Sequence, residues 1–117
     1  MTKQPSTPTV PTDSLDDLRE RQRRFAAERD WEQFHKPKNL AMSVAIEAAE
    51  IMEHFQWLTA DQSANLDAAT RREVGHEIAD VLLYLVRLAD VLGIDMAAAA
   101  REKIELNAQK YPAQRGL

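Results

Sequence analysis

The chain has 117 residues, a formal net charge of −4 and no cysteine. This length fits one domain, and the absence of cysteine excludes disulfides, thiolate metal ligands and a cysteine nucleophile. The chain has no block of lysine and arginine, which argues against a nucleic acid polymer as partner but leaves room for a single nucleotide whose charge a metal neutralises. We find neither an apolar leader nor an uninterrupted apolar run of membrane-spanning length, so we expect a cytoplasmic protein without a membrane partner.

The N-terminal third of the chain predicts a tail, a helix and a loop. Residues 1–13 are rich in proline, threonine and serine and are expected to form a disordered tail. Ser14 and Asp17 have the spacing of a capping box, which predicts a first helix over about residues 15–29. Residues 30–39 contain aromatic side chains and Pro37, and they predict a structured loop.

The rest of the chain predicts three further helices. Asn39 is expected to cap a helix over about residues 40–57, and the polar residues 58–67 predict a connection with room for one short turn. Asp67 is expected to cap a helix over 68–92 that ends at Gly93, and Asp95 one over about 96–109. No segment shows the strict alternation of a strand. We therefore expect an all-α domain over residues 14–112, with a short C-terminal tail over 113–117.

The segment from Ile78 to Leu92 carries apolar residues around most of its helical circumference. A helix that is apolar on all sides has to be covered on all sides. Three other helices in a chain of this size would leave one side in water, so we predict a dimer or a larger assembly. The alternative is a central helix that its own chain surrounds.

Two carboxylate pairs are the main candidates for a functional site: Glu47-x-x-Glu50 and Glu77-x-x-Asp80. Residues three apart share one face of a helix, and here that face is the border of the apolar stripe. Two such helices packed together would bring four carboxylates into one partly buried cluster, which needs a cation or protons. Ligands that are all oxygen suit Mg²⁺ first and Mn²⁺ second.

Other side chains could contact a ligand, although each also has a purely structural interpretation. Tyr84 lies one turn beyond Asp80 and could cover the carboxylates or be a core residue. Trp31 and Trp57 offer flat surfaces for a nucleobase, or they anchor loops to the core. His35 is interpreted as a structural or surface residue rather than a ligand. One face of the last helix could bind phosphates or be solvated, and it carries Lys103, Asn107 and Lys110.

The combined motifs resemble those of the MazG-like all-α nucleoside triphosphate pyrophosphohydrolases. The resemblance rests on the two carboxylate motifs, on FAAERDWEQFHKPKNL (25–40) and EAAEIMEHFQW (47–57), and on EIADVLLYLVRLA (77–89) and NAQKYP (107–112). It is strongest with the branch of dCTP pyrophosphatases. It implies a four-helix bundle that forms an intertwined dimer or a dimer of dimers. It also implies Mg²⁺ as cofactor and hydrolysis of a nucleoside triphosphate to the monophosphate and pyrophosphate.

The resemblance also implies roles for individual residues. Glu47, Glu50, Glu77 and Asp80 match metal ligands, and either Glu50, our preferred candidate, or Glu47 would orient the attacking water. Trp31, Trp57 and Tyr84 match residues that line the nucleotide site, and Lys103, Asn107 and Lys110 match residues near the phosphates. Gln22 stands where animal members have a histidine that helps line the base site, which leaves the base preference open. The competing hypotheses are a non-catalytic helical interaction module and a protein that sequesters nucleotides without turnover.

Overall fold

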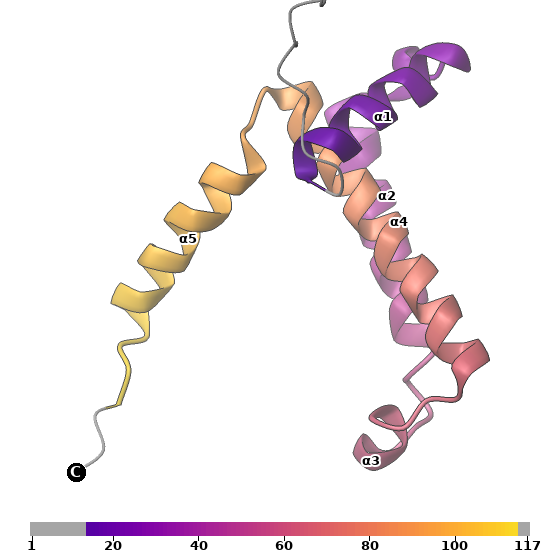
Figure 1. Cartoon of the computed structure of the whole chain (residues 1–117), viewed down its shortest axis with the longest axis vertical. Helices are drawn as coiled ribbons and strands as arrows, with labels where there is room; N and C mark the ends of the chain where they lie inside the picture. The colour runs from indigo at the N-terminus through magenta and orange to yellow at the C-terminus, as the bar shows by residue number, and fades with distance from the viewer. Residues whose placement is uncertain (1–13, 115–117) are drawn as a thin grey trace, which may run out of the picture.

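The computed structural model describes residues 14–114, so the predicted tail over 1–13 and the last residues, 115–117, lie outside the described part. Every regular element between Ser14 and Gln114 is helical, which confirms the predicted all-α fold (Figure 1). No helix in this range is long and apolar enough to cross a membrane. The elements are α1 (Leu15–Glu28), η1 (Glu32–Phe34), α2 (Pro37–Glu53), α3 (Ala60–Ser63), α4 (Ala68–Leu92) and α5 (Met96–Lys110).

Local capping explains why three helices begin where the sequence predicts. The side chains of Ser14, Asp67 and Asp95 each accept a hydrogen bond from the backbone N–H three residues later, at 3.0, 2.7 and 3.0 Å. These bonds satisfy amide groups that the first turn of a helix leaves without a partner. Helix α4 ends at Gly93, which adopts a left-handed conformation with φ of 68°. Glycine has no Cβ and accepts this conformation without strain.

The second helix differs from its prediction at both ends. It begins at Pro37 with Lys36 as its N-cap, three residues before the predicted start. Proline has no N–H to leave unsatisfied and a fixed φ, so it suits the first turn. Asn39 does not cap the helix, because its side chain donates to the backbone carbonyl of Phe34 at 3.2 Å. The helix ends at Glu53, and residues 54–57 continue as turns.

Three of the four long helices pack together. Helices α2 and α4 lie alongside each other, and α1 lies against the C-terminal half of α4 (Figure 1). The buried apolar side chains of these helices are Ala26, Leu40, Val74, Val86 and Ala89. Helix α5 leaves this group after Gly93 and stands apart from it (Figure 1). A four-helix bundle is therefore not closed within one chain.

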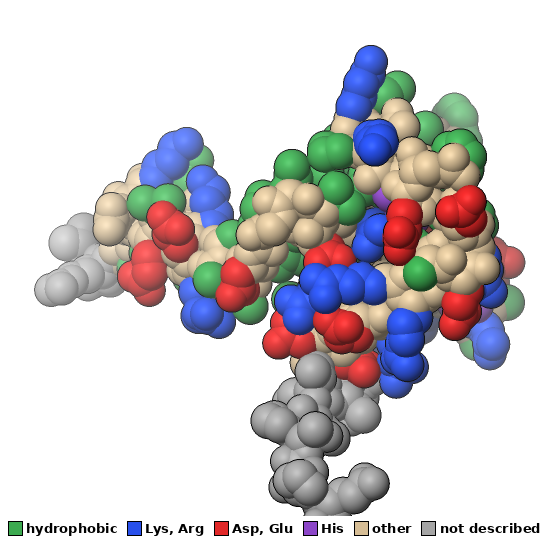
Figure 2. All heavy atoms as spheres, turned by 90° about the horizontal axis from the view of Figure 1, so that it is seen from above, with side chains coloured by type: hydrophobic (Ala, Val, Ile, Leu, Met, Phe, Trp, Pro, Cys, Tyr) green, Lys and Arg blue, Asp and Glu red, His purple; other side chains and the backbone are tan. Residues whose placement is uncertain are grey.

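The exposed surface carries apolar side chains among charges of both signs. Ile78 and Leu92 on α4 and Ile104 on α5 are 54, 51 and 65% exposed, so the apolar circumference of α4 is not covered by its own chain. Figure 2 shows exposed hydrophobic side chains interspersed with basic and acidic ones, and no broad basic area on the face that it displays. The alternative that one chain surrounds its central helix is wrong for the described residues.

Candidate metal and nucleotide site

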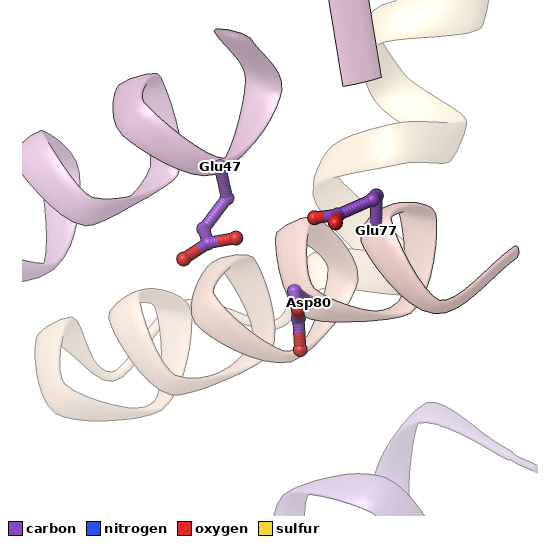
Figure 3. A group of neighbouring side chains, drawn as sticks. All are labelled: Glu47, Glu77 and Asp80. Atoms are coloured by element: carbon purple, nitrogen blue, oxygen red, sulfur yellow. The ribbon is translucent and has the colours of Figure 1, made fainter. Parts of the chain in front are cut away.

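Three of the four predicted carboxylates meet where α2 and α4 pack together. Glu47 extends from α2 toward Glu77 and Asp80 on α4, and one oxygen atom of each lies within 4.8 Å of the others (Figure 3). Glu77 and Asp80 share a helix face because they are three residues apart. Glu50 lies one turn beyond Glu47, and its carboxyl group adds to the crowding around Glu47 and Glu77.

This crowding changes the acidity of two groups. Burial, the adjacent carboxyl group of Glu50 and the charges of Asp80 and Glu77 raise the pKa of Glu47. The adjacent carboxyl group of Glu50, burial and the charge of Asp80 raise the pKa of Glu77, which the charge of His54 opposes only in part. Both carboxyl groups therefore resist ionisation until positive charge or protons compensate their neighbours.

The carboxylate cluster fits a divalent cation. The Oε2 atoms of Glu47 and Glu77 are buried and have no hydrogen-bond partner among the described residues. Buried carboxylate oxygens without partners are costly, and a bound cation would compensate them. Octahedral Mg²⁺ holds oxygens at about 2.0–2.1 Å, so adjacent ligands lie about 2.9 Å apart and opposite ones about 4.1 Å apart. Side-chain movements of about 1 Å would bring the three oxygens into this range.

A cleft of about 390 Å³ adjoins the cluster at Asp80. It brings together three of the residues predicted to line a nucleotide site: Gln22 from α1, Trp31 before η1 and Tyr84 from α4. Trp31 meets the ring of Phe25 edge to face at 5.4 Å between centroids. The other residues that line the cleft are Ala26, His35, Leu83 and Arg87. A concave, largely apolar and aromatic surface with a few polar groups is typical of a small-molecule site.

Sequence reasoning missed two polar residues of this cleft, Arg87 and His35. The Nε of Arg87 donates to the Nδ1 of His35 at 2.9 Å, and its Nη1 donates to Asp90 at 3.2 Å. Burial and the charge of Arg87 lower the pKa of His35, so His35 accepts this bond as a neutral side chain. The only sequence signal was the spacing of Arg87, three residues after Tyr84 and seven after Asp80, which places it on the face of the candidate site.

Four predicted site residues do not reach the cleft within one chain. Trp57 follows the end of α2 and is 86% exposed. The remaining three lie on α5, which stands apart from the carboxylates, and all are exposed: Lys103, Asn107 and Lys110. Their roles stay predictions that require a second chain.

The geometry defines a class: an all-helical protein with a carboxylate cluster that fits a cation, beside an aromatic cleft. The model of the MazG-like family matches residues 42–117, and the chain belongs to this family. It is 40% identical over 105 residues to dCTP pyrophosphatase 1 of Homo sapiens, an alignment that covers 88% of this chain and 62% of the human protein. The corresponding protein of Mus musculus is 41% identical over 105 residues, which are 87% of this chain and 61% of that protein. The chain therefore spans less than two thirds of these relatives.

A solved structure extends the comparison to the fold. The chain resembles the crystal structure of a pyrophosphatase from Archaeoglobus fulgidus DSM 4304, with a TM-score of 0.81 and 39% sequence identity. This match covers 92% of the present chain and 100% of the archaeal one. The fold of the described helices is thus that of a known pyrophosphatase.

Proposed function

We propose that the protein is a Mg²⁺-dependent nucleoside triphosphate pyrophosphohydrolase that converts dCTP, or a modified dCTP, to the monophosphate and pyrophosphate. The observation that carries this proposal is the carboxylate cluster with two buried, unpartnered oxygens at the entrance of an aromatic cleft. The names of the relatives support the reaction and the cytosine base: two are called dCTP pyrophosphatase 1, and the structural relative is a pyrophosphatase.

The residues of the cluster would have two roles in hydrolysis, metal binding and orientation of the attacking water. Glu47, Glu77 and Asp80 would hold Mg²⁺, and Mn²⁺ could replace it. When bound, the cation neutralises charge on the phosphate oxygens and polarises a water molecule. Glu50 lies beside Glu47 and Glu77, and it is our candidate for orienting the attacking water and accepting its proton. The water oxygen bonds to the α-phosphorus, the bond from this phosphorus to the α–β bridging oxygen breaks, and pyrophosphate leaves.

The cleft would hold the nucleoside beside this chemistry. Trp31 offers a ring on which a base can stack, with Phe25 fixing it from one edge. Tyr84 lies one helical turn from Asp80 and would contact the sugar of a nucleotide whose phosphates bind at Asp80. Water is displaced from the apolar walls when a base enters, which strengthens the polar contacts at the rim.

A second copy of the chain would complete the site. The exposed apolar residues of α4 and α5 need a partner surface, and a dimer or a dimer of dimers would supply it. Such an assembly would place α5 of one chain against the cleft of another. Lys103, Asn107 and Lys110 would then contact the phosphates of a substrate bound to the neighbouring chain, and Trp57 would close its nucleotide site.

Isotope labelling tests the reaction directly. Purified protein is incubated with dCTP and Mg²⁺ in ¹⁸O-labelled water, and the products are separated and weighed by mass spectrometry. Attack at the α-phosphorus places the label in dCMP, and pyrophosphate stays unlabelled. Label in pyrophosphate, or release of orthophosphate and dCDP, contradicts the mechanism. Binding of dCTP without any product would identify a sequestering protein instead.

A matched pair of variants tests the site. Asp80→Asn should lower kcat by about tenfold or more, since each decade corresponds to only about 1.4 kcal/mol of transition-state stabilisation. Glu53→Gln removes a carboxylate from the exposed side of α2 and should retain activity. Full activity in Asp80→Asn, or equal losses in both variants, would remove the cluster from the mechanism.

A further inference from the structure

Arg87 is a buried cation on a wall of the cleft. It is 8% exposed and is the only charged residue among the buried ones of the described chain. His35 and Asp90 fix its guanidinium from two sides, through Nε and Nη1. Arg23 also donates to Asp90, at 2.8 Å, so this carboxylate is held in place independently of Arg87. The remaining nitrogen, Nη2, has no acceptor among residues 14–114, although its residue lines the cleft.

Gln22 faces the same cleft from α1, and its amide orientation is fixed. Its Nε2 donates to the backbone carbonyl of Leu83 at 3.4 Å. A carbonyl oxygen can only accept, so the amide nitrogen must point toward Leu83. The Oε1 atom is then left as a free acceptor, with no donor among the described residues. The cleft therefore holds one free acceptor on α1 and one free donor on α4.

The position of Arg87 along α4 indicates which part of a nucleotide it would meet. It follows Asp80 by seven residues, which corresponds to about 10 Å along the helix axis. Tyr84 lies between them on the same wall. A nucleotide anchored by its α-phosphate at Asp80 would pass its sugar near Tyr84 and present its base near Arg87. This assignment rests on the proposed function, since the metal site fixes the phosphate end.

We propose that Arg87 and Gln22 together select a base that carries an exocyclic amine beside an unprotonated ring nitrogen, as cytosine does. The amine of cytosine would donate to Oε1 of Gln22, and its N3 would accept from Nη2 of Arg87. Uracil and thymine present the reverse pattern, an acceptor oxygen beside an N3–H donor. With either base, the exocyclic oxygen would face Oε1 of Gln22, and the N3–H would face the Nη2 donor of Arg87. Both polar groups of the cleft would then stay unpaired.

The test compares dCTP with dUTP in two variants. Arg87→Met keeps an unbranched side chain of the length of the arginine stem and removes the guanidinium donors. We expect it to lower the ratio of kcat/KM for dCTP over dUTP by about tenfold or more, which is the scale on which one good base contact discriminates. Arg23→Met is the matched control, since it removes the other cation on Asp90 but does not line the cleft. It should keep the ratio of the unmodified protein. A purely structural role of Arg87 would lower both rates together and leave the ratio unchanged.

A second variant of Arg87 and a binding measurement test the base contact even if Arg87→Met does not fold or no nucleotide is hydrolysed. Arg87→Lys retains a cation for Asp90 and should fold even if Arg87→Met does not; it lacks the planar fork and should also lose the preference. Binding of the α,β-methylene analogues of dCTP and dUTP, measured calorimetrically with Mg²⁺, separates recognition from turnover. If no nucleotide is hydrolysed, the proposed function fails, and the binding ratio still tests the base contact. An unmodified protein without preference for dCTP over dUTP, or an unchanged ratio in a folded Arg87 variant, overturns the inference.

Discussion

Replacing Glu47 with glutamine should change the melting temperature in opposite directions with and without Mg²⁺. In the metal-free protein, Glu47 stands among Glu50, Glu77 and Asp80, and these neighbours and burial raise its pKa. Its ionised form is therefore unfavourable in the fold, and neutral glutamine should raise the melting temperature at pH 7. With Mg²⁺ bound, the same substitution removes a ligand and should reduce the stabilisation by the metal.

The size of the metal effect follows from binding linkage. A ligand that binds only the folded state stabilises it by RT ln(1 + [L]/Kd), about 2.7 kcal/mol at a hundredfold excess over Kd. For a domain of about 100 residues, 1 kcal/mol shifts the melting temperature by roughly 4–8 °C. Saturating Mg²⁺ should thus raise the melting temperature of the unmodified protein by about 10–20 °C. The shift in Glu47→Gln should be clearly smaller at the same Mg²⁺ concentration.

Differential scanning calorimetry in chelator and over a Mg²⁺ titration measures both quantities. Glu53→Gln is the control, because it removes the same charge from the exposed side of the same helix. It should leave the metal-induced shift intact. A melting temperature that neither Mg²⁺ nor Mn²⁺ moves would refute the metal site. A metal-free Glu47→Gln that melts below the unmodified protein would refute the assigned electrostatic strain.

Three further predictions follow from the cluster, the cleft and the exposed apolar surface. The raised pKa values of Glu47 and Glu77 contribute stability that is fully present below about pH 4.5 and is lost as pH rises through the folded-state values; melting curves should show this loss in chelator, and Mg²⁺ should abolish it. Trp31→Ala should chiefly raise KM for dCTP, because stacking of roughly 1–3 kcal/mol per base acts about equally on bound substrate and transition state; a fall in kcat alone would contradict this role. Light scattering should show at least a dimer at micromolar concentration, and a monomer of 13.3 kDa would contradict the completion of the site by α5.

Local signals explain why much of the fold was predictable. Ser14, Asp67 and Asp95 predict helix starts, because each side chain accepts a hydrogen bond from a backbone N–H only three residues later. Gly93 marks the end of α4, because glycine accepts the left-handed conformation in which the helix stops. Pro37 misled the prediction, because its ring is as compatible with the first turn of a helix as with a loop. The carboxylate cluster was predictable because the i, i+3 spacing fixes the face of each pair and two apolar stripes must pack together.

Long-range contacts explain what the sequence could not predict. The bond from Arg87 to His35 joins residues 52 positions apart, and that from Gln22 to Leu83 joins residues 61 apart. Gln22, His35 and Arg87 each have an ordinary surface interpretation in the sequence. Only the packing of α1 and of the loop at His35 against α4 shows that they line one cleft. The separation of α5 from the bundle was equally hidden, because the sequence of α5 has the same capping signals as a packed helix.

The arrangement divides the candidate site into two halves that depend on different helix contacts. The carboxylates depend on the packing of α2 against α4, whereas the base cleft depends on α1 and the loop at Trp31 resting on α4. Both halves share helix α4, which carries Asp80, Tyr84 and Arg87 at successive positions along its axis. Under the proposed function, substitutions at the interface of α1 and α4 should therefore alter which nucleotide is accepted while the carboxylate cluster stays intact. If the proposed function holds, this separation provides a physical route by which such a helical protein could change its base preference without rebuilding its carboxylate cluster.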